Sequence, residues 1–475
     1  MIGIFLIGSL LISLAYFFSK NHLLNVVLAF AFCLLHGALA VDVYMHRDIT
    51  QMVYFTPDAL AVILVCVNSI ICIPTFYHSF VYFSKHPYKP HEMGLFYGAM
   101  VLLTASISAA YLSNHMGILW IFVELTTLSA SALIYHRRNK LTLEGTWKYI
   151  FICSISITLV FIGILFVTVA VQHKGITDLF YTTLSENATL LSPFWLKLSF
   201  LFIFTGFTAK AGLVPMYTAG IDAKDKAPYP AGAILASVLM NVGFVGIFRF
   251  YEITSHTEIY AWTNKILLIS AILSVFVAAV YMLRVKNIKR MMAYSGVEHM
   301  GIIMLGIAAG GIGYYAAILH LVLHSFAKPA LFFQFGQIYR TYGSKSVYDV
   351  GHYFKYNITG ALVLLFSFFI VTAMPPSGMF VSEFLVFKSL FASGYLWVLI
   401  LTMILLTVII WAFGKNVFKM LFIKPVDFDE SNVTRIPVSE SLSQYILLAL
   451  VVYLGLNPPD QLVSLIHSAI STLPK

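Results

Sequence analysis

The sequence predicts an all-α polytopic membrane protein of about fourteen transmembrane helices, because apolar runs of about 20 residues recur along the chain. Of the 475 residues, 60% are hydrophobic and only 10% are charged, whereas a soluble domain carries about 25% charged residues. Mean hydropathy is +0.88. The net charge of +9 comes from short loops between the apolar runs. It is therefore no signal of nucleic-acid binding.

The predicted spans are distributed over the whole chain. The first, Met1–Phe18, lacks a clear positive flank and a cleavage site, so it is interpreted as a span and not as a signal peptide. The runs next to Pro215 and Pro228 are interrupted. From Gln461 onward the tail is predicted to be short and amphipathic. The spans start near Ile2, Leu23, Ala59, Met93, Met116, Tyr149, Trp195, Pro230, Lys265, Met291, Tyr314, Thr359, Leu396 and Leu442.

Basic residues concentrate in the loops that follow odd-numbered spans. Arg137 and Arg138 follow span five, and Lys286, Lys289 and Arg290 lie around the loop after span nine. Loops rich in Lys and Arg stay in the cytoplasm. The pattern therefore predicts an even number of spans with both termini on the outer face.

The cysteines predict no metal or redox centre. Cys33, Cys66, Cys72 and Cys153 are scattered and form no CxxC pair. Iron–sulfur clusters and structural zinc sites need clustered ligands. We therefore expect no cofactor and no metal in this chain, and any redox chemistry would belong to another subunit.

Two helix breaks stand out within the apolar runs. Lys210 lies among apolar residues before a break at Pro215, and the polar stretch Asp222–Lys226 follows. A charge at the bilayer centre costs about 2.5–3.5 kcal/mol on insertion scales, so an intramembrane Lys indicates function. A second break falls at Ala373–Glu383 (AMPPSGMFVSE). Paired breaks of this kind suggest inverted repeats whose broken helices meet near the bilayer midplane.

Two carboxylates lie inside spans, Glu124 in span five and Glu383 after the second break. Each is either a packing group that bonds a neighbouring helix or a proton carrier. Glu124 is predicted to pair with Lys210. A nearby carboxylate favours the charged form of an ammonium group, and its withdrawal favours proton release.

Span eleven carries a polar stripe of His320, His324 and Lys328, which recur every four residues on one helix face. Imidazole titrates near neutral pH, so the stripe suits a proton relay, and the alternative is histidines that only pack. The i, i+4 histidines also fit a metal site, but no matching Cys or carboxylate follows them. Glu298 and His299, near a cytoplasmic basic cluster, are expected to be exposed to water and are secondary candidates.

Together these residues resemble the antiporter-like membrane subunits shared by respiratory complex I, Mrp-type cation/proton antiporters and membrane-bound hydrogenases. The resemblance covers about Asp58 to Lys388. The EHMG that follows AYSG and the LHxxxHxxxK stripe are most similar to hydrogenase-4 component F. The motifs that carry it are Trp120–Glu124, Lys210–Pro215 (KAGLVP), Ala227–Pro230, Lys289–Met300, His320–Lys328 and Pro375–Glu383.

The resemblance implies two inverted five-helix repeats, a central hydrophilic axis and proton pumping driven by a redox partner. It implies that Glu124 and Lys210 form a regulating pair, that His324 and Lys328 form a central relay, and that Glu383 is the exit group. It also implies three segments. Residues 1–57 form N-terminal helices, residues 58–390 form the proton-translocation core, and residues 391–475 form C-terminal helices and a short tail.

Three regions depart from the family pattern. Tyr217 and residues 219–221 stand where many members have His and Trp-Leu-Pro, and Asn287 replaces a common acidic residue. Asn241 replaces a lysine or histidine and cannot titrate. A proton crossing from Lys210 to His324 would therefore need bound water near Asn241, and an amide side chain can hold such water.

Three function classes follow. The leading hypothesis is a proton-conducting or sodium-conducting subunit of a multi-subunit redox complex, in the inner (cytoplasmic) membrane of a prokaryote, with other membrane and peripheral subunits as partners. One alternative is a proton channel that energises a soluble partner, for example one that captures inorganic carbon. Another is a non-pumping membrane anchor, against which the costly intramembrane charges argue.

Overall fold

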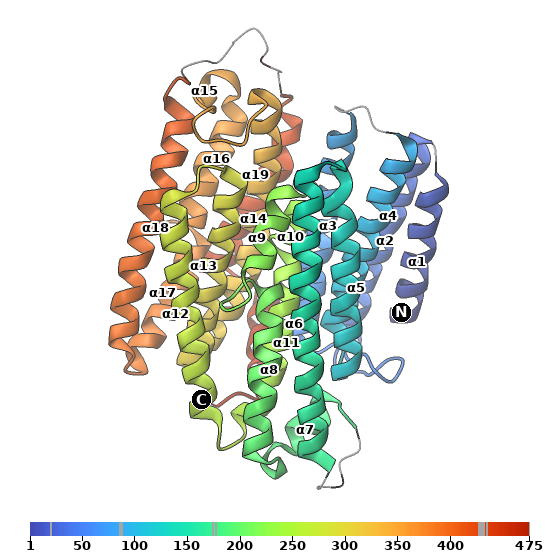
Figure 1. Ribbon diagram of the computed structural model, residues 1–475, viewed down its shortest axis with the longest axis vertical. Coiled ribbons are helices and arrows are strands. Elements are labelled where there is room, and N and C mark those ends of the chain that lie inside the picture. Colours follow the sequence, from blue (N-terminus) through green and yellow to red (C-terminus); the bar gives the residue numbers. More distant parts are fainter. Residues whose placement is uncertain are drawn as a thin grey trace. The chain divides into compact units, whose positions relative to one another are not determined.

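The computed structural model describes residues 1–19, 21–84, 89–172, 175, 178–425, 433 and 436–474. Regular structure in these residues is helical, apart from a few isolated bridges (Figure 1). Twelve helical segments of the described chain are long and apolar enough to cross a membrane, and Ile2–Phe18 and Ile358–Val371 are shorter apolar helices. Every predicted span start falls inside one of these helices. The all-α polytopic fold is therefore confirmed, whereas the inverted repeats stay a prediction.

The chain divides into two compact units. Unit 1 comprises Met1–Ile266 together with Gln461–Lys475. The amphipathic tail predicted beyond Gln461 forms a helix, α20. The helices of unit 1 are α1 (Ile2–Phe18), α2 (His22–Met45), α3 (Ala59–Ser84), α4 (Pro90–Leu112), α5 (Met116–Ile134), η1 (Tyr135–Arg137), α6 (Lys140–Gln172), α7 (Tyr181–Glu186), η2 (Ala188–Leu190), α8 (Pro193–Ala211), α9 (Thr218–Lys226), α10 (Tyr229–Leu235), α11 (Val238–Ser255) and α20 (Asp460–Ala469).

Unit 2 comprises Leu267–Asp460. Two of its helices, α13 and α14, are buried along their most apolar stretches and form its centre. Its helices are α12 (Tyr260–Arg284), which starts in unit 1, and α13 (Ile288–Ala309), α14 (Ile312–Tyr342), α15 (Tyr353–Tyr356), α16 (Ile358–Val371), α17 (Gly378–Ala392), α18 (Leu396–Phe422) and α19 (Ser439–Leu456).

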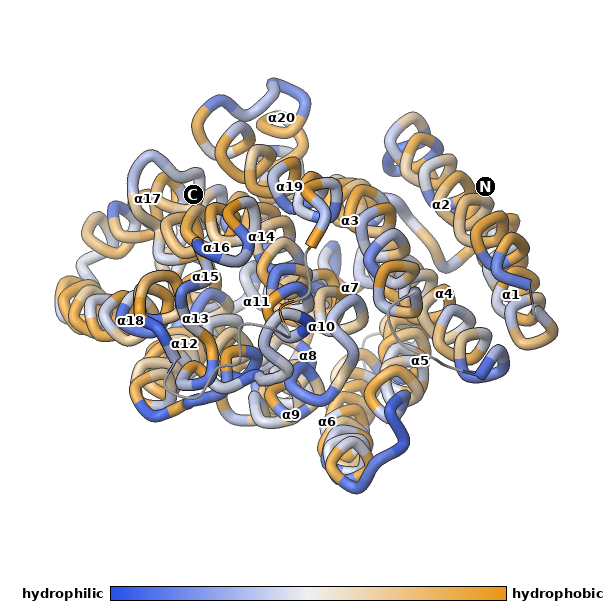
Figure 2. Tube along the Cα trace, turned by 90° about the horizontal axis from the view of Figure 1, so that it is seen from above, coloured by the Kyte–Doolittle hydropathy of each residue, from blue (hydrophilic) through white to orange (hydrophobic). Residues whose placement is uncertain are grey.

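Large apolar side chains are exposed on the outer helices of both units. Phe30 on α2, Phe151 on α6 and Trp397 on α18 are examples, and Trp397 is 82% exposed. Figure 2 shows that hydrophobic residues extend along the helices and that hydrophilic residues gather mainly in the connections. Apolar surface on this scale is typical of contact with lipid and not with water.

The first predicted break is present in unit 1. Helix α8 ends at Ala211 because Gly212 adopts the left-handed conformation, with φ of 78°. The end of α8 packs closely on α11, where a Cβ added at Gly243 would lie 2.2 Å from the backbone nitrogen of Ala211. Only glycine permits this approach, and it fixes Lys210 in the buried last turn of α8.

The second predicted break separates α16 from α17 in unit 2. Ser377 caps α17, since its Oγ accepts a hydrogen bond from the backbone nitrogen of Phe380 at 3.2 Å. A Cβ at Gly378 would lie 2.2 Å from the carbonyl oxygen of Val451, so the start of α17 packs directly on α19. This contact places Glu383 in the second turn of α17.

Candidate functional site

Lys210 is held inside unit 1 by neutral oxygen atoms. Its ammonium group donates hydrogen bonds to Thr127 Oγ1 at 2.9 Å and to Tyr149 OH at 3.0 Å. It also lies 5.2 Å from the centroid of the Tyr149 ring, within the range of a cation–π interaction. Lys210 is 7% exposed. The hydrogen-bond partners of the Lys210 ammonium group are therefore neutral hydroxyl groups.

Glu124 lies on α5, one turn before Thr127. Its Oε2 atom is buried and has no hydrogen-bond partner. Among the described residues no carboxylate comes within 4.0 Å of the Lys210 ammonium, although the charge of Glu124 acts on Lys210 electrostatically. Glu124 and Lys210 therefore interact electrostatically at longer range and do not form a direct ion pair.

Lys224 is a buried cation within the polar stretch Asp222–Lys226. It lies on the short helix α9, outside the membrane-spanning segments, and is only 3% exposed. Its Nζ atom contacts Met240 Sδ at 3.0 Å, and it forms no ion pair within the described part of the chain. Burial lowers the pKa of Lys224 from its ordinary value of 10.5 to about 7. The neighbouring Asp225 pairs with Lys226 instead, at 3.0 Å.

Asn241 is completely buried on α11. It hydrogen-bonds with Tyr111, whose hydroxyl group donates to the carbonyl oxygen of Val238 at 2.5 Å. Val238 is the first residue of α11, directly after the interruption between α10 and α11. Asn241 therefore lies beside a broken helix, as the sequence predicts.

In unit 2 the polar stripe of α14 is buried as a whole, since His320, His324 and Lys328 are all inaccessible to solvent. Lys328 donates a hydrogen bond to Ser295 Oγ at 2.7 Å. Ser295 in turn donates to Glu298 Oε2 at 3.3 Å. The hydroxyl group of Ser295 therefore connects the ammonium group to a carboxylate.

His299 and His320 form a second hydrogen-bonded series. His299 Nδ1 lies 3.1 Å from His320 Nε2, and His320 Nδ1 lies 2.9 Å from Ser382 Oγ. Ser382 gives its own proton to the carbonyl oxygen of Met379 at 2.9 Å, so it must accept a hydrogen bond from His320 Nδ1. His320 Nε2 is then the acceptor, and His299 Nδ1 is the donor.

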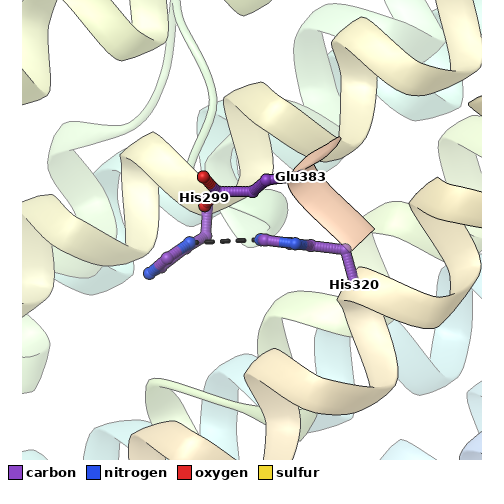
Figure 3. A group of neighbouring side chains, drawn as sticks. All are labelled: His299, His320 and Glu383. Carbon is purple, nitrogen blue, oxygen red and sulfur yellow. Dashed lines mark hydrogen bonds between the residues drawn. The ribbon is translucent and has the colours of Figure 1, made fainter. Parts of the chain in front are cut away.

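Glu383 meets these histidines from α17. One ligand atom from each of His299, His320 and Glu383 lies within 4.8 Å of the other two, and Figure 3 shows the three side chains converging. Glu383 and Glu298 also border one cavity of about 220 Å³. The remaining lining residues of this cavity include Thr372, Phe380, Phe384, Met403 and Thr407.

The expectation that Glu298 and His299 are exposed to water is wrong. Glu298 is 3% exposed and His299 is 0% exposed, because α13 is buried throughout its apolar stretch. The sequence does carry a signal for this arrangement. Ser295, Glu298 and His299 stand at positions i, i+3 and i+4, which lie on one face of a helix. The ring of His324 lies near that of His299, with centroids 5.4 Å apart, and its relay role stays a prediction.

A family model for the transmembrane region of NADH:quinone oxidoreductase and Mrp antiporter subunits matches residues 113–409, more than half of the chain. The chain belongs to this family. The predicted resemblance to antiporter-like membrane subunits is therefore confirmed.

Relatives of this antiporter-like subunit span most of its length. A hydrogenase-4 component F homolog of Methylacidiphilum infernorum (isolate V4) is 28% identical over 419 residues, which cover 86% of this chain and 87% of that protein. The NADH-quinone oxidoreductase subunit N of Hydrogenovibrio crunogenus is 26% identical over 431 residues, which cover 88% of this chain and 86% of that protein.

Solved structures show the same fold at lower identity. A chain of the archaeal membrane-bound sulfane sulfur reductase superposes with a TM-score of 0.86 at 20% identity, over 99% of this chain and 96% of that one. A chain of the Mrp complex from Dietzia sp. DQ12-45-1b superposes with a TM-score of 0.84 at 17% identity, over 99% of this chain and 95% of that one.

Proposed function

We propose that this antiporter-like subunit translocates protons as a membrane component of a multi-subunit complex that a redox partner drives. The names of its relatives, a hydrogenase-4 component F homolog and an NADH-quinone oxidoreductase subunit, support such an assembly. The redox centres would belong to the partner subunits. The subunit would lie in the inner membrane of a prokaryote with both termini outside, as the distribution of basic loops indicates.

One observation carries the proposal. In unit 2, Lys328, Ser295 and Glu298 form one hydrogen-bonded series, and His299, His320 and Ser382 form another. The two series approach each other where Glu298 Oε1 lies 3.7 Å from His299 Nδ1. Groups that exchange protons need hydrogen-bond contact or one bridging water. A small shift of Glu298 would join the two series.

Glu383, on α17, would be the last proton-carrying residue of this route. Its carboxylate has no hydrogen bond to a described residue and faces the cavity that Glu298 also borders. A cavity of about 220 Å³ has room for several water molecules, each of which takes about 30 Å³ of liquid volume. Glu383 would therefore exchange protons between the histidines and water in the cavity.

Lys210 and Glu124 would control proton loading in unit 1. Neutral hydroxyl oxygens accept hydrogen bonds from the Lys210 ammonium group. Glu124, one helical turn before Thr127 on α5, interacts with this ammonium group electrostatically. A movement of the Glu124 carboxylate toward the ammonium group favours proton uptake, and its movement away favours proton release. Such a movement costs little free energy, because the Oε2 atom of Glu124 has no hydrogen bond that would have to break.

The proposal is tested by proton flux into vesicles that contain the purified complex with Lys210→Ala or Glu124→Gln. We expect both variants to assemble and to lose at least about 90% of the flux, since neither substituted side chain can carry or respond to a proton. The matched controls are Lys197→Ala, an exposed lysine on the same helix α8, and Glu144→Gln, an exposed carboxylate on α6. Wild-type flux in both Lys210→Ala and Glu124→Gln would refute the role of this pair. Flux that vanishes in sodium-free buffer would identify sodium as the transported ion instead.

A further inference from the structure

Three helices of unit 2 bring three potential metal ligands close together. His299 comes from α13, His320 from α14 and Glu383 from α17, and their ligand atoms lie within 4.8 Å of one another (Figure 3). All three side chains are buried. Sequence spacing alone suggested a pair of histidines on one helix and no third ligand, whereas the fold supplies one histidine and one carboxylate from other helices.

The hydrogen bonds around His320 prepare it as a ligand. Because Ser382 donates its proton to Met379, His320 Nδ1 must carry a proton and His320 Nε2 presents a lone pair toward His299. Metal-binding histidines commonly have this arrangement, in which the outer nitrogen donates to a fixed acceptor and the inner nitrogen binds the metal. His299 Nε2 is buried without a hydrogen-bond partner. It can accept the proton that Nδ1 must release, so His299 remains a neutral ligand by changing tautomer.

The separation of the two imidazole nitrogens suits a tetrahedral ion. The two inner nitrogens, His299 Nδ1 and His320 Nε2, are 3.1 Å apart. With Zn–N bonds of about 2.05 Å, this separation corresponds to an N–Zn–N angle of about 98°, and an opening of about 0.2–0.3 Å gives the tetrahedral angle. The third ligand, Glu383, borders the cavity, so a water molecule can take the fourth position.

We propose that His299 Nδ1, His320 Nε2 and a Glu383 carboxylate oxygen form a binding site for a divalent transition-metal ion of the Zn²⁺ class. Two imidazoles and one carboxylate favour such an ion over Mg²⁺ or Ca²⁺, which prefer oxygen ligands. The ion binds the ionised form of the Glu383 carboxyl group, and its positive charge favours that form. The ammonium group of Lys328 donates a hydrogen bond to Ser295.

A bound ion would also interrupt the hydrogen-bonded series between His299 and His320, because it occupies the two lone pairs that meet there. Inhibition of proton flux by Zn²⁺ is therefore expected, and this consequence rests on the proposed function. Binding itself does not rest on it.

The test measures binding and flux separately on the intact purified complex. After removal of metals by chelation, the complex is equilibrated with Zn²⁺ or Co²⁺ and desalted, and bound metal is counted by elemental analysis. We expect one more ion per complex in the wild type than in His299→Leu or Glu383→Gln, together with visible absorption bands of tetrahedral Co²⁺ in the wild type only. Ser382→Ala, a mild change outside the ligand set, should weaken affinity about 10-fold or more.

Two histidine variants serve as controls. His324→Leu removes a neighbouring imidazole, and His36→Leu removes a buried imidazole on α2 that hydrogen-bonds Ser108; both should keep the extra ion. Equal metal content in the wild type and His299→Leu would overturn the metal site without affecting the proposed proton transport. Metal that binds at full occupancy without slowing proton flux would support the site and contradict the proton route through these histidines.

Discussion

The substitution Ser295→Ala tests the proton route at the single hydroxyl group that connects Lys328 to Glu298. The Ser295 hydroxyl accepts from Lys328 at 2.7 Å and donates to Glu298 at 3.3 Å. Alanine removes both contacts and leaves the charged groups without their shared partner. Hydrogen bonds to charged groups contribute about 1.5–3 kcal/mol each. If one such contribution enters the barrier to proton transfer, the rate falls about 10- to 150-fold, at about 1.4 kcal/mol per factor of ten.

The assay is proton flux into vesicles at a fixed rate of turnover of the complex. Ser295→Thr keeps a hydroxyl group and should keep at least about half of the flux, since the donor and the acceptor both remain. Thr402→Val is the matched control, because Thr402 is a buried hydroxyl on α18 that donates only to its own helix, to Val398 O at 2.8 Å. Equal rates of proton transport in Ser295→Ala and Thr402→Val would refute the proton route through Ser295.

Three further predictions concern unit 1. Gly243→Ala should lower the stability of the complex by about 1–3 kcal/mol, the usual cost of overpacking, because its Cβ would lie 2.2 Å from Ala211 N. The control Gly37→Ala should leave the stability unchanged, because its Cβ would meet nothing closer than 4.0 Å. Equal melting temperatures of the two variants would contradict this packing. Lys224→Met should be more stable than the wild type below about pH 7, and the difference should shrink as the pH rises toward 10.5. Burial lowers the pKa of Lys224 to about 7, so between these pH values the unfolded chain binds more protons than the folded one and wild-type stability rises with pH; melting curves with a pH-independent difference would contradict the buried charge. Asn241→Lys should raise proton flux by supplying a titratable group, and unchanged flux would mean that water already bridges this position.

Much of the fold could be predicted from the sequence, because each span is an apolar run that must satisfy its backbone hydrogen bonds within a helix. Proline likewise indicated the two breaks, at Pro215 and at Pro375 and Pro376. In the structure α8 already ends before Gly212. These are local signals, and local signals determine where a helix ends.

The candidate site was only partly predictable, because helix periodicity does not reveal which helices become neighbours. Glu298 and His299 stand near a basic cluster and resemble the end of a span, yet α13 is buried on all sides in unit 2. Lys224 lies in a connecting stretch rich in charge, yet the packing of α9 buries it, with its Nζ atom against Met240 Sδ. The approach of Glu383 to His320 depends on the contact between α17 and α14, which links residues more than 60 positions apart.

The most direct test of proton transport by this chain is the number of protons moved per turnover in vesicles that hold the complex with Lys328→Met. Methionine, one atom shorter than lysine, fills most of this fully buried site but cannot bind a proton or donate to Ser295. If protons pass through Lys328, the assembled complex will move almost no protons. A proton count equal to that of the wild type would contradict it.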